Sequence, residues 1–327
     1  MKIFQYVRPL EQKAAISALS KEQASNFIAG GTNLLDLMKR RVMNPDRLVD
    51  INQLPLKEIR KDGNLLRMGA LAINSKVADD KLVVQSFPLL SHALNAGASA
   101  QLRNMATVGG NLMQRTRCPY FYDTAMPCNK REPGTGCGAL EGFNRMHAIF
   151  GTSDKCIAVN PSDMNVALTA LDATVWVSGL AGDRKISIAD FHRLPGDHPE
   201  KDTNLEKNEL ITAVTIPENP FNKNSYYLKV RDRTSYAFAL VSVAAALHLD
   251  GKRIVDARLA MGGVAHKPWR LTEAERSLQG KTVSESVFRN AAEIAMKGAK
   301  AYKHNAFKLK MAPNSIVQAL RTAAGNP

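Results

Sequence analysis

The sequence predicts a two-domain α+β protein. Its 327 residues are enough for two domains of ordinary size. Apolar segments with strand-like and helix-like spacing follow one another along the chain. A stretch rich in Pro, Asn and Lys, Glu218 to Ser225, divides these segments into two groups. We therefore expect one domain over residues 1–220 and a second over residues 221–327.

The composition is that of a globular protein. Hydrophobic residues make up 45% of the chain and charged residues 23%, which excludes collagen, low-complexity disorder and a disulfide-dense miniprotein. The longest apolar run, Phe238 to Leu249, is too short to cross a bilayer, so we expect no transmembrane segment. The first residues, MKIFQYVRPLEQKAA, lack the apolar core of a secretion signal. We expect a cytoplasmic protein, or a periplasmic one exported together with a partner subunit.

Short helices and strands are expected in the first domain. Glu11 to Ser20 has helical spacing, and the apolar strand Asn26 to Ala29 ends at Gly30-Gly31. Glycines 179 and 182 favour a hairpin. The expected helices are 11–20, 32–39 and 89–100, and the expected strands are 26–29, 48–51, 65–71, 173–177, 185–188 and 210–216.

The second domain is expected to combine a small sheet with helices. The strands are Tyr226–Val230, Ala239–Leu249 and Ala257–Gly262, and the second of these is apolar enough to be central. Helical spacing follows over Ser284–Lys300 and Ser315–Ala323.

Two paired-glycine turns are candidate anion sites. One is Gly30-Gly31 before Thr32-Asn33, and the other is Gly109-Gly110 between Thr107 and Asn111. Glycines let backbone N–H groups approach a phosphate, and a following helix favours negative charge. The Rossmann G-x-G-x-x-G and P-loop G-K-[ST] patterns are absent from the sequence. Each turn alone is typical of a helix start, whereas the pair could hold one extended, doubly charged ligand from two sides.

All the cysteines lie in one irregular segment, residues 115–156, which is rich in Gly, Pro, Arg and aromatic residues. A loop this long inside a compact domain is usually functional. Disulfides would need an oxidising compartment, and zinc sites usually show C-x2-C pairs, which are absent here. An iron–sulfur cubane needs four thiolates without such pairs, and nearby Arg and Lys side chains would offset its charge. The residues leave the three interpretations open. The four cysteines are Cys118, Cys128, Cys137 and Cys156.

The chain is basic, with a formal net charge of +14. Such an excess attracts nucleic acid, anionic cofactors or an acidic protein. Zinc-finger spacing, a basic region leading into heptads and an RNP-like strand are all absent from the sequence, so we expect no nucleic-acid partner. The basic residues near the C-terminus form either a solvated helix face or a docking surface for an acidic partner.

Five motifs in order resemble the FAD-binding subunits of molybdenum hydroxylases, the xanthine dehydrogenase and aldehyde oxidoreductase family. The resemblance covers essentially the whole chain, and Arg117–Tyr122 is similar to the aldehyde oxidoreductases with three subunits. It implies a fold like that of the vanillyl-alcohol-oxidase flavoproteins, with two α/β subdomains followed by a domain of antiparallel sheet and helices. The motifs are Phe27–Leu35, Ala106–Leu112, Pro161–Met164, Glu209–Pro217 and Tyr227–Ala237.

The resemblance also implies roles for individual residues. The first glycine turn would wrap around the FAD pyrophosphate, and the second turn would provide a second set of contacts to FAD. Asp163 would bind near the ribityl or ribose hydroxyls, Ile211 would pack on the flavin ring, and Lys229 would bring a cation to the flavin or phosphate. Each of these three residues also has a purely structural interpretation. Asp163 could cap a helix, Ile211 could be an ordinary core residue, and Lys229 could be a solvated charge on a strand. The two turns contribute Phe27, Ile28, Ala29, Gly30, Gly31, Thr32, Asn33 and Leu34, and Thr107, Gly110 and Asn111.

Most members of the family have no cysteine quartet between the second glycine turn and the Ser-Asp motif. A subset similar to this chain holds a [4Fe-4S] cluster there, which implies that the four cysteines are cluster ligands. In this interpretation no residue of the chain is catalytic. Electrons would pass from a molybdenum-cofactor large subunit through a [2Fe-2S] small subunit to FAD in this chain, and then to an external acceptor. The rival hypotheses are a stand-alone flavoenzyme of the same fold and a basic binding module held together by zinc.

Overall fold

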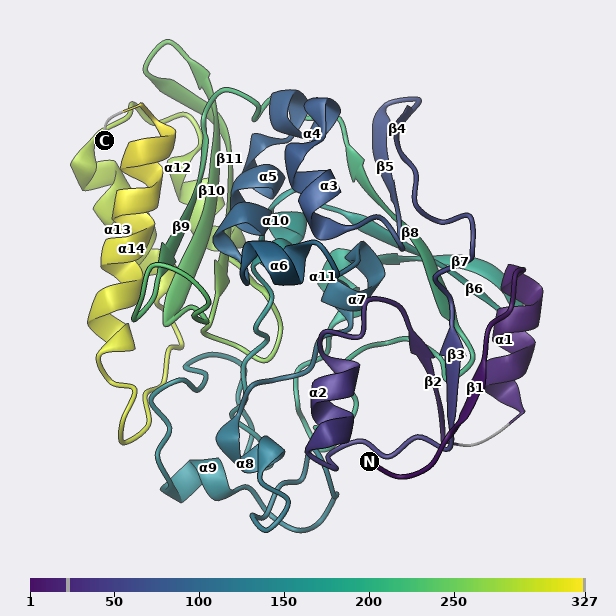
Figure 1. Ribbon diagram of the computed structural model, residues 1–327. Helices are drawn as coiled ribbons and strands as arrows, with labels where there is room; N and C mark the ends of the chain where they lie inside the picture. Colours follow the sequence, from purple (N-terminus) through teal and green to yellow (C-terminus); the bar gives the residue numbers. More distant parts are fainter. Residues whose placement is uncertain (22–23, 326–327) are drawn as a thin grey trace.

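The computed structural model describes residues 1–21 and 24–325. It contains three sheets with helices between and around them, which confirms the α+β class (Figure 1). The first sheet is parallel and has the order β1-β3-β2, formed by Gln5–Val7, Arg47–Asp50 and Ser25–Ile28. Helix α1 (Gln12–Ser20) covers it, and α2 (Leu34–Lys39) follows β2 directly.

The second sheet is antiparallel and forms most of the remaining N-terminal region. Its order is β4-β5-β8-β6-β7. Helices α5 (Pro88–Ala96) and α10 (Asp163–Ala170) pack together, and both contribute to the core that this sheet covers. The strands are Ile59–Asp62, Leu65–Gly69, Leu210–Pro217, Thr174–Gly179 and Gly182–Ser187, and the smaller helices are α3 (Asn74–Asp79), α4 (Lys81–Ser86), α6 (Ala100–Arg103), α7 (Val108–Leu112) and α11 (Ile188–Phe191).

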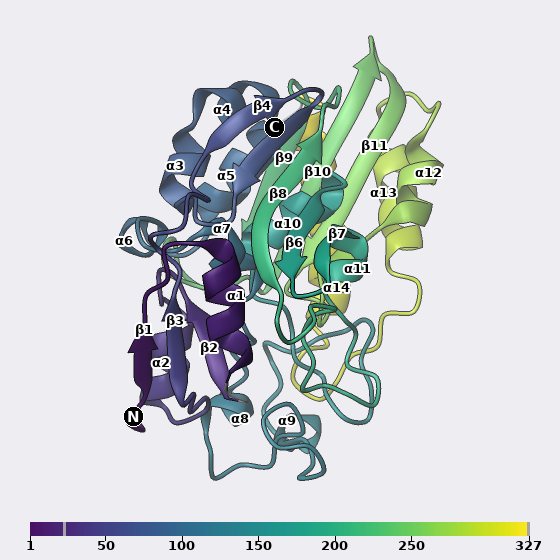
Figure 2. The same cartoon turned by 90° about the vertical axis from the view of Figure 1, so that its right-hand side faces the viewer.

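The third sheet, order β12-β11-β10-β9, is antiparallel and lies between the two regions (Figures 1 and 2). Side chains of β10 alternate between two cores: Val243 and Ala245 face the C-terminal helices, whereas Ala244 and Ala246 face the core that contains α5 and α10. Burial on both faces explains the continuous apolar run of this strand. The strands are Trp269–Arg270, Arg253–Gly262, Val241–Asp250 and Ser225–Val230, and the helices are α12 (Thr272–Leu278), α13 (Glu285–Ala295) and α14 (Lys308–Ala323).

The structure differs from the sequence prediction at several helix ends. The helix predicted over residues 89–100 ends at Ala96 in the structure. Gly97 and Ala98 leave the helical conformation, and Ala98 has a positive φ. Helix α13 ends at Ala295, and Gly298 beyond it has φ of 80°. Helix α14 begins at Lys308 and carries Pro313 within it, although proline usually marks a helix start. Among the elements that the sequence prediction omitted are β1, β4, β12, α3, α4, α6, α11 and α12.

Residues 115–156 form the irregular segment that was predicted. Only two short helical turns interrupt it, α8 (Pro119–Tyr122) and α9 (Gly138–Glu141). In Figure 1 this segment lies at the bottom of the molecule, below α2 and α14. Within the described ranges, every helix is too short or too polar to cross a membrane.

Candidate functional site

The two glycine turns contact each other. A Cβ on Gly30 would lie 1.9 Å from the carbonyl oxygen of Met105, so only glycine fits there. Two residues after Met105 the second turn begins, and the Thr107 hydroxyl accepts a hydrogen bond from the Gly110 amide at 3.2 Å. The turns therefore meet edge to edge, although they are far apart in the sequence.

A cleft runs along both turns. One chamber has a volume of about 320 Å³ and is lined by residues of both turns, including Gly30, Gly31 and Thr107. A larger chamber of about 680 Å³ extends toward Asp163 and Lys229. Both volumes are in the range of small-molecule sites. The residues that line both chambers are Thr32, Asn33, Ala106 and Gly110.

Unpaired polar groups face this cleft. The Asn33 carboxamide oxygen accepts a hydrogen bond from the Arg115 amide at 2.8 Å. Its Nδ2 group, in contrast, is buried without a partner among the described residues. The Oδ1 atom of Asn74, which lines the larger chamber, is likewise buried without a hydrogen-bond partner among the described residues. Buried polar groups without partners are rare in folded proteins, so these atoms indicate that a polar ligand belongs in the cleft.

Asp163 and Lys229 form a buried ion pair at the far end of the larger chamber. The Lys229 Nζ atom lies 2.7 Å from Asp163 Oδ2, and it also donates to the Ala96 carbonyl at 3.1 Å. The Tyr227 hydroxyl donates to Asp163 Oδ1 at 2.8 Å. Desolvation and the Asp163 carboxylate raise the pKa of Tyr227 well above its ordinary value. The charge of Lys229 is thus already balanced by the protein.

Most of the predicted FAD-binding residues line the two chambers. Asn111 is positioned by the Ser162 hydroxyl, which donates to its Oδ1 atom at 2.6 Å. Phe27 packs against the core below β2, and Ile211 is buried in β8 opposite Val177. Neither of these two side chains lines the chambers. The lining residues are Ile28, Ala29, Gly30, Gly31, Thr32, Asn33, Leu34, Thr107, Gly110, Asn111, Asp163 and Lys229.

The four cysteines line a single cavity of about 10 Å³. All are free thiols. The backbone segments at Cys128 and Cys137 lie side by side in an isolated antiparallel β-bridge. Burial raises the pKa of Cys118 to about 12 and that of Cys156 to about 11. In the described part of the chain, no group of three or more His, Cys, Asp and Glu side chains is placed to hold a single metal ion.

Backbone amides lie close to three of the sulfurs and lower the pKa of each thiol against the larger effect of burial. The amides of Tyr120 and Phe121 act on Cys118, and the Ala158 amide acts on Cys156. Three further amides, those of residues 139, 140 and 157, act on Cys137. Amide dipoles that point at sulfur stabilise a thiolate. These amides offset part of the effect of burial, which still raises the pKa of all three thiols.

A third chamber shares lining residues with the cysteine cavity and with the cleft. Its volume is about 90 Å³, and its lining includes His147, Cys118, which also lines the cysteine cavity, and Asp163, which also lines the larger chamber. Arg117 lines both this chamber and the larger chamber of the cleft. Of the four cysteines, Cys118 is the one that lines this chamber beside the cleft.

Asp202 links the cysteine segment to the first glycine turn. Its carboxylate pairs with the buried Lys130 ammonium and with Arg115, whose Nε lies 2.6 Å away. These two cations hold the pKa of Asp202 well below its usual range, although burial acts in the opposite direction. Because the Arg115 amide also bonds Asn33, the cysteine segment and the turn share one polar network.

Several lining residues were not nominated from the sequence. They are Asn74, Arg103, Arg233, Tyr236 and Phe238 of the larger chamber. Arg233 and Tyr236 stand within the last quoted motif, so the motif itself was a usable signal. Asn74 and Arg103 lie in unremarkable local sequence and reach the cleft only through the packing of α3 and α6.

Known families match both regions of the chain. Residues 2–219 match the family described as the FAD binding domain in molybdopterin dehydrogenase. Residues 226–323 match the CO dehydrogenase flavoprotein C-terminal domain.

Similar proteins have been characterised in several organisms. The aldehyde oxidoreductase FAD-binding subunit PaoB of Escherichia coli (strain K12) is 49% identical over 327 residues, which cover 99% of each chain. The glyceraldehyde dehydrogenase medium chain of Sulfolobus acidocaldarius is 31% identical, with 88% of this chain and 85% of that one covered. A chain of quinoline 2-oxidoreductase from Pseudomonas putida 86 superposes with a TM-score of 0.76 at 27% identity, covering 99% of both. These likenesses confirm the predicted fold.

Proposed function

This chain belongs to the FAD-binding subunits of the molybdopterin dehydrogenases, the molybdenum hydroxylase family, and on that premise we propose that it passes electrons through FAD and a [4Fe-4S] cluster. The electrons come from the [2Fe-2S] clusters of a small subunit, which is reduced by a molybdenum-cofactor large subunit that oxidises an aldehyde. They leave to an external acceptor. A bound flavin exchanges electrons singly or in pairs, and the protein supplies position and electrostatics.

The contact between the two glycine turns is the observation that carries the proposal for FAD. The amides of Gly31, Thr32 and Asn33 make no hydrogen bond to another group in the described ranges, and the Asn33 Nδ2 group beside them lacks a partner. A pyrophosphate between the turns would accept hydrogen bonds from these donors. The residues of the two turns therefore fit the pyrophosphate of FAD.

The other predicted residues take positions around the same ligand. In the larger chamber Asp163 offers a carboxylate to sugar hydroxyls, while Lys229 holds that carboxylate in place through their ion pair. Ile211 supports the cleft from the β8 core and does not line it. We therefore assign Ile211 and Phe27 to the packing around the FAD site, and the remaining predicted residues to contact with FAD.

The four cysteines fit a [4Fe-4S] cluster by their number and chemistry. Such a cluster takes one thiolate for each iron, and here four free thiols, two of them buried and two half-buried, share one cavity. Backbone amides directed at Cys118, Cys137 and Cys156 are suited to a negatively charged group.

A visible absorption spectrum with iron and acid-labile sulfide analysis tests both cofactors. We expect flavin bands over a broad iron–sulfur background, with about four irons for each FAD. Replacing Cys137 with Ser should remove the background and leave the flavin bands. A protein with FAD but without iron would contradict the cluster assignment alone. A protein that cannot be loaded with FAD would contradict the whole proposal.

A further inference from the structure

One side chain reaches a cysteine sulfur in the candidate cluster cavity. The Nε2 atom of His147 lies 3.1 Å from Cys118 Sγ, and both residues line the chamber that leads to the FAD cleft. In the part of the chain described by the structure, every other hydrogen bond to a cysteine sulfur comes from the backbone. The sulfur of Cys118, which lines the chamber beside the cleft, therefore has a side-chain hydrogen-bond partner, which the other three sulfurs lack within the described residues.

The C-terminal region holds His147 in this position. The backbone carbonyl of His147 accepts hydrogen bonds from Lys308 Nζ at 2.9 Å and from Asn305 Nδ2 at 3.2 Å. Lys308 also donates to the Gly263 carbonyl at 2.6 Å. Lys308 and Asn305 are both fully buried. These contacts tie the backbone at His147 to the start of α14, and the His147 side chain is itself buried.

The surroundings of the ring determine which nitrogen carries the proton. A thiolate sulfur only accepts hydrogen bonds, so Nε2 must be the donor toward Cys118. The Nδ1 atom is buried and has no partner among the described residues. A proton on Nδ1 would leave a buried donor unpaired, whereas a lone pair there is tolerated more easily. Both considerations place the proton on Nε2.

We propose that His147 donates a hydrogen bond to the Cys118 sulfur and raises the reduction potential of the [4Fe-4S] cluster, acting as a positioning residue through that cysteine. The inference rests on the cluster assignment above. A reduced cluster carries one more negative charge than an oxidised one, so a donor to its sulfur stabilises the reduced form more. Cys118 is also the cysteine that lines the chamber adjoining the cleft, which shares Arg117 and Asp163 with the larger chamber.

The test compares the cluster midpoint potential in His147→Phe, His147→Gln and the parent protein, each assembled with its cofactors. Phenylalanine fills the space without a donor, whereas the glutamine amide can replace the Nε2–H group. At the parent's midpoint we expect the oxidised-to-reduced ratio of His147→Phe to rise about tenfold, which is about 59 mV for one electron. The glutamine variant should restore most of the difference.

His192→Phe is the matched control, because His192 is equally buried but donates to the Leu112 carbonyl and not to sulfur. Its midpoint potential should equal that of the parent. If His147→Phe shifts no more than His192→Phe does, the proposal is wrong. A parent protein without iron would instead overturn the cluster assignment, together with this inference.

Isotope labelling keeps the proposal testable if the Phe variant fails to assemble. In parent protein labelled with ¹⁵N-histidine, pulsed EPR of the reduced cluster should detect weak coupling to a histidine nitrogen. The His147→Gln protein, labelled in the same way, should lose this coupling. A labelled parent with a reduced cluster and no histidine coupling would contradict the hydrogen bond.

Discussion

Gly30 lies so close to the Met105 carbonyl that its substitution tests the FAD site directly. Its backbone is outside the left-handed region, so the effect of Gly30→Ala would be steric and not conformational. We expect the added methyl group to force the two turns apart at a cost of about 1–3 kcal/mol. If FAD binds across both turns, its affinity should fall by about tenfold or more, as measured by flavin fluorescence titration of the FAD-free protein.

Gly179→Ala provides the matched control for this substitution. Gly179 also has an ordinary backbone conformation, and the nearest atom to an added Cβ is Glu209 Cγ at 3.1 Å, a side-chain atom and not a backbone atom. It lies in the β6–β7 hairpin and does not line the cleft. FAD affinity should stay within about twofold of the parent. Equal loss of affinity in the two variants would show that the contact between the turns does not matter.

Sequence reasoning identified the glycines but not the contact that requires Gly30. That contact joins positions 30 and 105, and a single sequence carries no sign of the pairing. The same holds for His147, to which the sequence alone assigns no role. Its partners Cys118 and Lys308 are distant in the chain, so only the folded arrangement shows its neighbourhood. Motifs reveal local chemistry, whereas contacts between motifs depend on topology.

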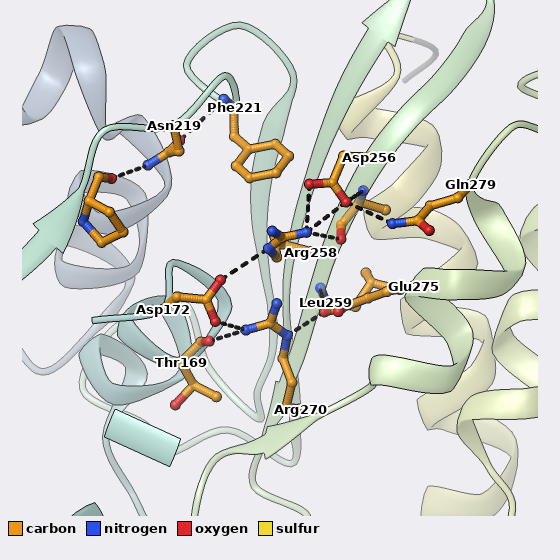
Figure 3. A network of polar contacts seen from close by, with 12 residues as sticks. Thr169, Asp172, Asn219, Phe221, Asp256, Arg258, Leu259, Arg270, Glu275 and Gln279 are labelled. Atoms are coloured by element: carbon orange, nitrogen blue, oxygen red, sulfur yellow. Dashed lines mark hydrogen bonds and ion pairs between the residues drawn. The ribbon is translucent and has the colours of Figure 1, made fainter. Parts of the chain in front are cut away.

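At the scale of elements, Arg270 of β12 fastens the C-terminal sheet to the end of α10 (Figure 3). Its guanidinium donates to the Thr169 carbonyl at 2.6 Å and to Asp172 at 2.7 Å, and it also pairs with the buried Glu275. Arg270→Ala would leave Glu275 buried without its cation. We expect a loss of about 3 kcal/mol in the free energy of unfolding, measured by urea denaturation monitored by circular dichroism.

Arg289→Ala is the comparison for this loss of charge. Arg289 forms an exposed pair with Glu285 one helical turn away on α13, and such pairs contribute about 0.5 kcal/mol or less. If Arg270→Ala destabilised the protein no more than Arg289→Ala, the network of Figure 3 would not hold the two regions together.

His192 links α7 and α10 and should make stability depend on pH. Its Nε2 lies 3.0 Å from the Leu112 carbonyl and 3.2 Å from Asn165 Nδ2. Burial lowers the pKa of His192 to about 4, with smaller opposing effects of the Leu112 carbonyl and Asp202 and a small further lowering by Lys267. Between pH 6.5 and 4 the unfolded chain binds a proton that the folded chain does not. Stability should therefore fall as the pH falls through this range, by roughly 3 kcal/mol from this residue.

The substitution His192→Gln isolates that contribution. Glutamine can still donate to the Leu112 carbonyl but cannot bind the proton, so the loss of stability between pH 6.5 and 4 should become smaller. It should not vanish, because burial also lowers the pKa of His266 to about 4. Urea unfolding curves at several pH values give the measurement. An unchanged pH dependence would mean that His192 is not the residue responsible.

Element patterns in the sequence were informative where one physical effect dominated. The apolar run of β10 correctly predicted a central strand, because both of its faces are buried. The prediction for the last helix was wrong at its start: it placed the start at Ser315, whereas α14 begins at Lys308 and includes Pro313. Tertiary contacts of the buried Lys308 and Asn305 hold the chain at the beginning of this helix. Local propensity could not reveal them.

At the scale of the whole molecule, the order and spacing of five motifs predicted the family correctly, and the domain matches bear this out. The sequence also predicted the irregular segment that carries all four cysteines, and the fold places these cysteines around one cavity. The chamber that adjoins both that cavity and the cleft could not be predicted, because it is built from segments of both regions, including Asp163 and Phe238.

The net charge of +14 predicts how the assembled protein should respond to salt. If the basic surface guides an acidic acceptor such as a ferredoxin, the rate of flavin reoxidation should fall by about tenfold as ionic strength rises from about 0.01 M to 1 M. The reason is that the screening length shortens from about 30 Å to about 3 Å over this range. Stopped-flow absorbance measures the rate, and a small uncharged quinone as acceptor should give a rate that does not change with salt. Equal salt dependence with both acceptors, or none with the ferredoxin, would contradict electrostatic guidance.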